Sequence, residues 1–254
     1  MSKTVLIIPD QHAHPDTDHT RADWLSKLII DLQPDTVVNL GDAADMPSLS
    51  SYDKGKRTFQ GRSYAKDIEA HLEFQDRLWG PVKARKKKLP LRVVLEGNHE
   101  HRIEKALDLS PELVGTISFD DFDFERYYDI IVPYEGGTPG VLELDGIHYS
   151  HFAVSGVMGR PVGGEHPAYT LLSKQFSSYT VGHTHTLDYC VRTDASGRKI
   201  HGLVAGVFQD YLSDWAGVAQ DLWWRGVCIK HNVEDGNYDL ELVSMERLEQ
   251  EYGQ

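Results

Sequence analysis

The stretch Lys3-Thr-Val-Leu-Ile-Ile-Pro-Asp10-Gln-His12 contains the pattern on which the fold is built. Its apolar, β-branched residues predict a buried strand that stops at Pro9, and an aspartate and a histidine follow at once. In open α/β sheets, ligands bind beside the carboxyl ends of the strands. Because Asp10 and His12 stand where a strand runs out, they are candidates for a binding site rather than for a surface turn.

Four further motifs repeat this arrangement in a fixed order along the chain. They are Gly41-Asp42 after Thr36–Leu40, Gly97-Asn98-His99-Glu100 after Leu91–Leu95, His151 after Ile147–Ser150, and Gly182-His183-Thr184-His185 after Tyr179–Val181. Each motif alone is a weak signal, but chance rarely supplies the whole ordered series. Together they offer two carboxylates, an amide and several imidazoles. This is a donor set for two divalent cations that share one carboxylate.

Helical patterns separate the first three of these strands. Arg21–Leu32 and Tyr64–Lys88 place apolar residues at helical spacing, with a break expected at Gly80-Pro81. Strands that alternate with helices predict a parallel sheet with right-handed crossovers. The later sequence predicts a hairpin around Asp145-Gly146, a helix at Ala168–Phe176, and strands at 187–192, 199–204, 225–233 and 238–244. We therefore expect an α/β fold with two layers of sheet covered by helices, forming a single domain over residues 1–254.

The overall charge narrows the classes of partner. The formal net charge is −13, whereas a protein that tracks a nucleic-acid backbone normally presents a basic face. Much of the acid lies in residues 119–129 and 234–251, which leaves room for a local basic face elsewhere. No apolar stretch approaches the length of a membrane span or of a signal-peptide core, and the two cysteines show no pairing pattern. These features predict a cytoplasmic protein with no membrane partner.

The five motifs together resemble the calcineurin-like metallophosphoesterase family, whose pattern is D-x-H, GD, GNH[DE], H and GHxH. The resemblance runs from Asp10 to His185, and no ligand position of the pattern is missing. It implies a four-layered α/β/β/α sandwich of the metallophosphoesterase type, which agrees with the two covered layers of sheet expected above. It also implies an enzyme that hydrolyses phosphoric esters with the help of two metal ions.

The resemblance further implies a role for each motif residue. The first metal ion would be held by Asp10, His12, Asp42 and His185. The second would be held by Asp42, Asn98, His151 and His183, so that Asp42 bridges the two ions. His99 would be the catalytic histidine that binds no metal, and Asp42 would take part in catalysis through the shared ions.

Elementary chemistry supports this arrangement. A bridging carboxylate holds two cations at a separation that lets one hydroxide touch both and attack phosphorus. Imidazole and amide ligands beside carboxylates favour Mn²⁺ first, with Fe²⁺, Zn²⁺ and Ni²⁺ as alternatives, over Mg²⁺ or Ca²⁺. His99, next to Asn98, could protonate the departing oxygen, which is typically worth ~10²–10⁴-fold in rate.

Several assignments have competitors. His148 lies on the same predicted strand as His151, but His151 stands at the end of the strand, as the other candidates do, and is favoured. Asn39, Asp45 and Glu100 are candidates for orienting the ligands. For Glu100 the alternative is an acid that opens the helix after its motif and is stabilised by the helix dipole.

The substrate contacts are less well defined. Candidates are Arg57, Arg62, His101, Arg102 and Arg160, of which the first two lie in a polar insertion that should overhang the site. For His101 a solvent-exposed position is the favoured alternative. The basic run at 83–88 precedes a strand that delivers the site at its far end, so we expect a solvated helix end. We expect Trp215, Trp223 and Trp224 to occupy core positions or to form a contact within a homo-oligomer.

The motifs also separate classes of phosphoesterase. Protein phosphatases of this superfamily continue the second motif as GDxVDRG, but here Gly41-Asp42 is followed by Ala-Ala-Asp-Met-Pro, which disfavours that activity. The run at 41–54, with Gly-Asn-His-Glu-His-Arg, is similar to phosphoesterases encoded by phages and prophages. This resemblance implies a protein that acts in the cytoplasm of the host. We interpret the protein as a phosphodiesterase or nuclease acting on nucleotides or DNA. The alternatives are a phosphomonoesterase on a small nucleotide or sugar phosphate, and a non-catalytic scaffold of the same fold.

Overall fold

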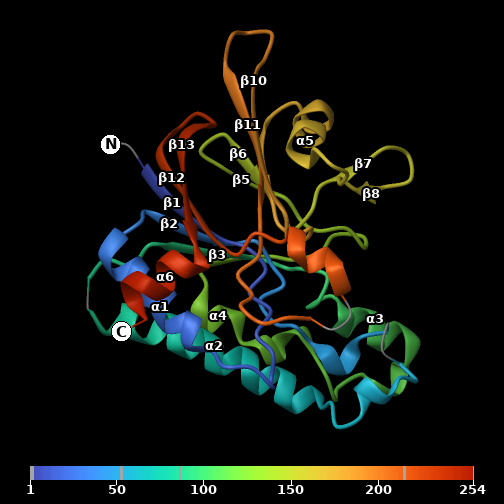
Figure 1. Ribbon diagram of the computed structural model, residues 1–254. Helices are drawn as coiled ribbons and strands as arrows, with labels where there is room; N and C mark the ends of the chain where they lie inside the picture. Colours follow the sequence, from blue (N-terminus) through green and yellow to red (C-terminus); the bar gives the residue numbers. More distant parts are fainter. Residues whose placement is uncertain (1–2, 52–53, 86, 214–215, 254) are drawn as a thin grey trace.

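Two β-sheets form the centre of the molecule, which the computed structural model describes over residues 3–51, 54–85, 87–213 and 216–253 (Figure 1). The larger sheet has the strand order β13-β12-β1-β2-β3-β4. Its strands are β1 (Lys3–Ile8), β2 (Thr36–Asn39), β3 (Leu91–Leu95), β4 (Ile130–Val132), β12 (Gly226–Glu234) and β13 (Asn237–Ser244). β1 to β4 run parallel, with Ile8 beside Asn39 and Asn39 beside Val94. The segments that follow these strands therefore emerge at one edge.

The second sheet has the order β10-β11-β9-β6-β5. Its strands are β5 (Leu142–Leu144), β6 (Ile147–Tyr149), β9 (Ser178–Val181), β10 (Leu187–Thr193) and β11 (Lys199–Ala205). β6 and β9 are parallel neighbours, so His151 and the 182–185 motif leave the sheet at the same end. A separate hairpin joins β7 (Val154–Ser155) and β8 (Arg160–Pro161).

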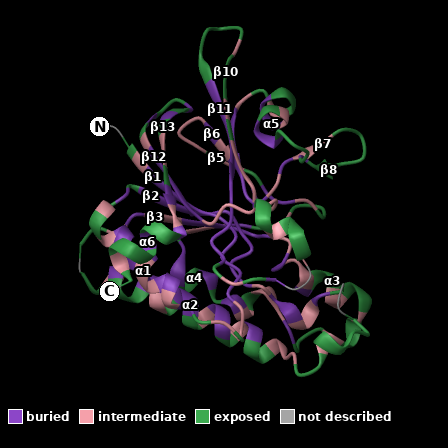
Figure 2. Ribbon diagram, in the orientation of Figure 1, coloured by how far each residue is buried: buried purple, intermediate pink, exposed green. Residues whose placement is uncertain are grey.

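The two sheets pack face to face around a shared apolar core. Ile7, Val38 and Leu95 of the first sheet meet Tyr149 and Leu203 of the second, and all five are almost fully buried (Figure 2). Burial of such side chains is the main favourable contribution to folding. The core also sets the spacing of the sheets, and it thereby brings the ends of strands from both of them together.

Helices cover the outer faces of the sheets. The first sheet packs against α1 (Thr20–Leu32), α2 (Tyr64–Ala84) and α6 (Met245–Tyr252), which contribute Leu25, Phe74 and Leu248 to a second cluster. On the second sheet, α5 (Pro167–Gln175) packs Ala168 and Leu171 against Tyr179 and Val181. The remaining helical segments are α3 (Arg102–Leu109), α4 (Phe124–Tyr127), η1 (Pro47–Leu49), η2 (Arg57–Phe59), η3 (Pro111–Leu113), η4 (Phe119–Phe122) and η5 (Gly217–Leu222). The molecule is thus a mixed α/β structure with more than one sheet.

The structure differs from the sequence prediction at several elements. α2 continues through Gly80-Pro81 and ends at Ala84, because both residues lie on its exposed face, where water can satisfy the carbonyl that Pro81 leaves unpaired. β4 has only three residues and carries no periodic pattern of its own. Glu100 lies in the turn before α3, which begins at Arg102, so it does not open a helix. Trp215 lies outside the described residues.

Membrane-spanning helices were also sought in the described part of the chain. No helix there combines the length and the apolar character needed to cross a bilayer.

Candidate metal centre

The side chains predicted to hold metal converge at one edge of the two packed sheets. They come from the segments that follow β1, β2, β3, β6 and β9, and they are Asp10, His12, Asp42, Asn98, His151, His183 and His185. Asn98 and His183 are half-buried, whereas the other five are buried. Polar groups at that depth need partners, because burial removes their contact with water.

Three of these residues form the first group of donors. One donor atom from each of Asp10, His12 and His185 lies within 4.8 Å of the others. Nε2 of His185 is 3.2 Å from Oδ2 of Asp10 and 3.1 Å from Nε2 of His12. Oδ1 of Asp10 is buried and has no hydrogen-bond partner among the described residues. Two ring nitrogens that face one another beside Oδ2 of the same carboxylate can be satisfied together by a cation.

The second group lies on the other side of Asp42. Donor atoms of Asp42, His151 and His183 also lie within 4.8 Å of one another. Nε2 of His151 is 3.4 Å from Oδ2 of Asp42 and 3.0 Å from Oδ1 of Asn98. The same Oδ2 of Asp42 is 3.9 Å from Nε2 of His12 in the first group. Asp42 therefore stands between the two groups.

Hydrogen bonds fix which nitrogen of each ring faces the centre. Nδ1 of His151 donates to the carbonyl of Leu40 at 2.9 Å, and Nδ1 of His12 donates to Oδ1 of Asp45 at 3.2 Å. Because the Nδ1 atoms are engaged outward, each Nε2 faces the centre, which is the orientation that metal-binding imidazoles require. The predicted competitor His148 instead stacks on Tyr179, with a ring separation of 5.7 Å.

The charges of the cluster follow from burial and close neighbours. Burial alone would raise the pKa of Asp42, but the positive charges of His151 and His99 hold it well below the usual range. Burial opposes a charge on His151, yet Asp42 and Asp10 raise its pKa to about 9. Burial and the charge of His151 lower the pKa of His183 to about 4. The cluster therefore offers an anionic Asp42 and a neutral His183.

Two motif glycines are required by the close approach of these loops. A Cβ on Gly97 would lie 2.1 Å from the backbone nitrogen of Asp42 and 2.2 Å from its Oδ1. A Cβ on Gly182 would lie 2.3 Å from Oδ1 of Asp10. Since non-bonded carbon and oxygen atoms do not approach so closely, any side chain at either position would displace an aspartate of the cluster.

The backbone of the cluster is strained. Left-handed φ angles occur at Asp10 (22°), His12 (46°), Asp42 (49°), His183 (70°) and His185 (61°). Each such residue costs on the order of 1–3 kcal/mol and persists only where the surrounding structure holds it. The strain turns the chain sharply after each strand, so that the side chains meet. Residue types alone did not indicate it.

Glu100 ties two of these turns together. Its buried carboxylate accepts hydrogen bonds from the backbone nitrogens of Asp42 (3.0 Å), Ala44 (2.9 Å) and Gly97 (2.8 Å). Burial and the charge of Asp42 raise the pKa of Glu100 to about 8, against the effect of these N–H donors. Glu100 thus links the loop after β2 to the loop after β3, as the prediction that it orients the ligands requires.

His99 sits at the rim of the cluster with its Nε2 facing inward. Its Nδ1 donates to the carbonyl of Asp45 at 2.6 Å and lies 3.0 Å from Oδ1 of the same residue. Its Nε2 is 3.8 Å from Oδ2 of Asp42 and accepts from Nη2 of Arg102 at 2.9 Å. Burial and Arg102 lower the pKa of His99. The contact with Arg102 was not anticipated from the sequence.

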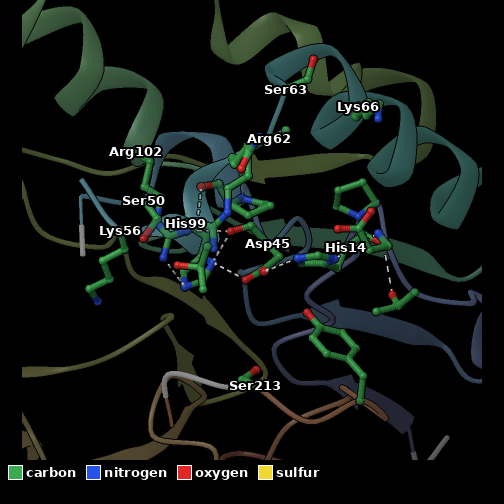
Figure 3. Close-up of a pocket in the computed structure, with 18 of the residues that line it drawn as sticks. His14, Asp45, Ser50, Lys56, Arg62, Ser63, Lys66, His99, Arg102 and Ser213 are labelled. Carbon is green, nitrogen blue, oxygen red and sulfur yellow. Dashed lines mark hydrogen bonds and ion pairs between the residues drawn. The ribbon is translucent and has the colours of Figure 1, made fainter. Parts of the chain in front are cut away.

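A cleft of about 720 Å³ opens beside His99 (Figure 3). Its walls come from the 14–17 loop, from residues 45–50 and 56–66, from the start of α3, and from the 211–213 loop. Two predicted substrate contacts, Arg62 and Arg102, line it. The other three, Arg57, His101 and Arg160, do not. His101 instead stacks on Tyr134 at a ring separation of 4.2 Å.

Trp223 is a further residue whose place at the site the sequence did not reveal. Its ring meets the ring of His185 edge-on, with centroids 4.3 Å apart and planes at 90°. The neighbouring Trp224 packs on the core between the sheets. A rigid indole beside His185 limits the rotation of that imidazole, and no pattern in the sequence around Trp223 signals the contact.

The fold and the cluster together define an α/β protein with a buried histidine–aspartate site that could hold metal ions. The chain is 29% identical to the Gene 54 protein of Mycobacterium phage L5 over 196 residues, which cover 73% of this chain and 70% of that protein. It is 28% identical to the Gene 54 protein of Mycobacterium phage D29 over 194 residues, with the same two coverages. The chain is therefore similar to phage proteins.

Two further comparisons add little to this. No family model matches the chain. Among solved structures, TT1561 of Thermus thermophilus aligns with 95% of this chain and 99% of its own length, at 8% identity and a TM-score of 0.37.

Proposed function

We propose that this protein is a binuclear metal-dependent phosphoesterase of the calcineurin-like type, which hydrolyses a phosphodiester bond in a nucleotide or nucleic acid. The observation that carries the proposal is the position of Asp42, whose Oδ2 lies 3.4 Å from Nε2 of His151 in one donor group and 3.9 Å from Nε2 of His12 in the other. Two ions that act together on one phosphate require a carboxylate shared in this way. Two packed sheets with helices outside them, which a four-layered α/β/β/α sandwich would require, support the same proposal.

The residues fit a pair of divalent cations. Asp10, His12, Asp42 and His185 would hold the first ion, and Asp42, Asn98, His151 and His183 the second. The Nε2 atoms of His12, His151 and His185 face one another or the carboxylates of Asp10 and Asp42 at 3.1 to 3.4 Å, so cations between them would meet several donors at once. Nitrogen donors beside carboxylates favour Mn²⁺, with Fe²⁺, Zn²⁺ and Ni²⁺ as alternatives. Two such ions would supply a hydroxide nucleophile at neutral pH and neutralise phosphate charge.

Residues of the chain itself would donate the proton to the departing oxygen and bind the phosphate. His99 is oriented by Asp45, and its inward Nε2, which accepts from Arg102 in this structure, would have to carry a proton to serve as the acid for an oxygen that leaves phosphorus. Arg102 is held against His99 by the carbonyls of Asp45 and Met46, at 2.7 and 3.0 Å. Its guanidinium is therefore placed to bind a phosphate oxygen as charge develops there.

One observation favours phosphomonoesterase activity as a second candidate. The cleft volume of about 720 Å³ lies within the range of about 300–1,000 Å³ that is usual for small-molecule sites. A nucleotide or sugar phosphate would fit there, and the net charge of −13 disfavours a long polyanion. Similarity to two phage proteins supports a phage-encoded enzyme that acts in the cytoplasm of the host.

The test is hydrolysis of bis-p-nitrophenyl phosphate and p-nitrophenyl phosphate by the protein loaded with Mn²⁺. We expect turnover that depends on metal, a preference for the diester, and loss of turnover in Asp42→Asn and His99→Ala. His151→Ala and His148→Ala form a matched pair: His148 lies on β6 and His151 just after it, but only His151 lies in the cluster. Loss of activity in His148→Ala alone would contradict the proposed site. A protein that binds Mn²⁺ and hydrolyses neither ester would refute the proposal and favour a scaffold.

A further inference from the structure

The cleft beside His99 concentrates positive charge in an otherwise acidic protein. Among the described residues, four cationic side chains line it, Lys56, Arg62, Lys66 and Arg102, together with two carboxylates, Asp16 and Asp45. The whole chain carries a net charge of −13. A local excess of cations in a concave site raises the concentration of anions there, even where the global field repels them.

One of the two carboxylates is already engaged. Oδ1 of Asp45 lies 3.2 Å from Nδ1 of His12 and 3.0 Å from Nδ1 of His99. The negative charge of Asp45 is therefore directed at the imidazoles rather than at the cations of the cleft.

Backbone carbonyls position the two arginines. Nη1 of Arg102 donates to the carbonyls of Asp45 and Met46, and Nη1 of Arg62 donates to the carbonyl of Pro47 at 2.9 Å. Three consecutive carbonyls thus orient guanidinium groups that come from α3 and from the segment before α2. Arg102 has no carboxylate partner within the described residues, and its charge is left to be balanced by a bound anion.

Lys66 extends the basic wall beyond the arginines. It lies in the first turn of α2, is exposed, and has no ion-pair partner in the part of the chain that the structure describes. Figure 3 shows Lys66, Arg62 and Arg102 around the cleft that His99 also lines. The exposed Leu212 and the ring of Tyr211 add an apolar part to the opposite wall.

We propose that this cleft binds a second phosphate of the substrate, carried on the leaving-group side of the scissile phosphorus. The inference rests on the proposed function, in which His99 faces the departing oxygen. Because His99 lines the cleft and Asp42 does not, the group that the departing oxygen carries enters the cleft. Arg102 serves the scissile group, and Arg62 and Lys66 hold the second phosphate. The preferred substrate is a short phosphodiester whose leaving half carries a phosphate of its own.

The size of the cleft sets the length of that substrate. A volume of about 720 Å³ accommodates a ligand of nucleotide size. A cleft of this size takes a ligand of one or two nucleotides and not a duplex of many base pairs. The leaving half is therefore one phosphorylated nucleoside, with its sugar or base against Tyr211 and Leu212. A leaving half of this size corresponds to the end of a single nucleic-acid strand rather than to its interior.

The test compares three thymidine dinucleotides, TpT, TpTp and pTpT, with the Mn²⁺-loaded protein. Their products identify which half leaves, and the ratio of kcat/KM to that of TpT measures the benefit of the second phosphate. We expect a ratio of about ten for the isomer whose leaving half carries the phosphate, since exposed charge pairs contribute modestly. Lys66→Glu should lower the ratio about tenfold and Lys66→Ala by less. Lys174→Glu, an exposed lysine of α5 outside the cleft, is the matched control.

The outcomes separate this inference from the proposed function. The protein could hydrolyse bis-p-nitrophenyl phosphate and yet show a kcat/KM ratio near one, or a ratio that is unchanged in Lys66→Glu. Either result would overturn the inference and leave the proposed phosphoesterase function standing. If no ester is hydrolysed, calorimetric binding of thymidine 3′,5′-bisphosphate decides the question. Weaker binding by Lys66→Glu than by Lys174→Glu would support the phosphate site, and equal binding would overturn it.

Discussion

Asp45→Asn should separate the orientation of the metal ligands from the chemistry of His99. Oδ1 of Asp45 contacts Nδ1 of His12 at 3.2 Å and Nδ1 of His99 at 3.0 Å. An amide oxygen in the same place still accepts a hydrogen bond, but without the charge that roughly doubles its strength. The variant also keeps the backbone carbonyl that holds His99 at 2.6 Å. The loss therefore falls mainly on His12, whose Nδ1 has no second support among the described residues.

The magnitude follows from that difference. A charge-assisted bond is worth about 1.5–3 kcal/mol and a neutral one about 0.5–1.5 kcal/mol, so Asp45→Asn should cost about 1–2 kcal/mol. At about 1.4 kcal/mol per factor of ten, the affinity for Mn²⁺ should fall about 5- to 30-fold. His99→Ala should instead lower kcat by ~10²–10⁴ with little change in Mn²⁺ affinity. Titration calorimetry with Mn²⁺ and hydrolysis of bis-p-nitrophenyl phosphate at saturating metal measure the two effects.

The comparison can fail in an informative way. His12, Asp42 and His99 also place donor atoms within 4.8 Å of one another, so His99 could be a ligand rather than an acid. A larger loss of Mn²⁺ affinity in His99→Ala than in Asp45→Asn would show this and would refute the reasoning above. Asp108→Asn, an exposed carboxylate of α3, controls for the change in net charge.

Three further predictions concern metal, packing and pH. Mn²⁺ at 100 times its Kd should stabilise the folded protein by about 2.7 kcal/mol, and Asp42→Asn should lose this gain in thermal unfolding. Gly182→Ala should weaken Mn²⁺ binding, because its Cβ would lie 2.3 Å from Oδ1 of Asp10. Gly163→Ala, which has open space around it, should leave Mn²⁺ binding unchanged. Equal affinities of the two variants in calorimetry would contradict the packing argument. Burial lowers the pKa of His71 from 6.5 to about 3, so only the unfolded chain takes up this proton as the pH falls below 6.5. The folded state is therefore destabilised on acidification. Between pH 8 and pH 5, the free energy of unfolding of the wild type, measured with denaturant, should fall by about 2 kcal/mol more than that of His71→Leu. Equal losses would be inconsistent with a neutral buried ring.

Much of the site could be predicted because its ligands follow strands directly. The strand from Lys3 to Ile8 was predicted with its observed bounds, and Asp10 and His12 follow it within a few residues. Local apolar patterning determines where such a strand ends, and a parallel sheet brings those ends to one edge. His151 could be chosen over His148 for the same reason, since only the residue at the end of the strand turns into the cluster.

What supports the ligands could not be predicted in the same way. The left-handed φ of Asp42 depends on Glu100, which holds its backbone nitrogen from the loop after another strand. Trp223 reaches His185 from a segment that carries no recognisable pattern. Such contacts arise from tertiary packing between residues that are distant in sequence, and packing routinely overrides local preference.

The cleft shows why the chemistry of this chain is easier to infer than its substrate. The ligands lie in short motifs, because each loop needs only a strand to place it. The cleft walls come instead from the 14–17 loop, residues 45–50 and 56–66, and the 211–213 loop, and none of these has a periodic pattern. Arg62 and Arg102 become neighbours of one site only because the carbonyls of residues 45–47 hold both. Selectivity therefore depends on the loop after Asp42, so exchanging residues 47–66 between related chains should change the substrate while leaving metal binding in place.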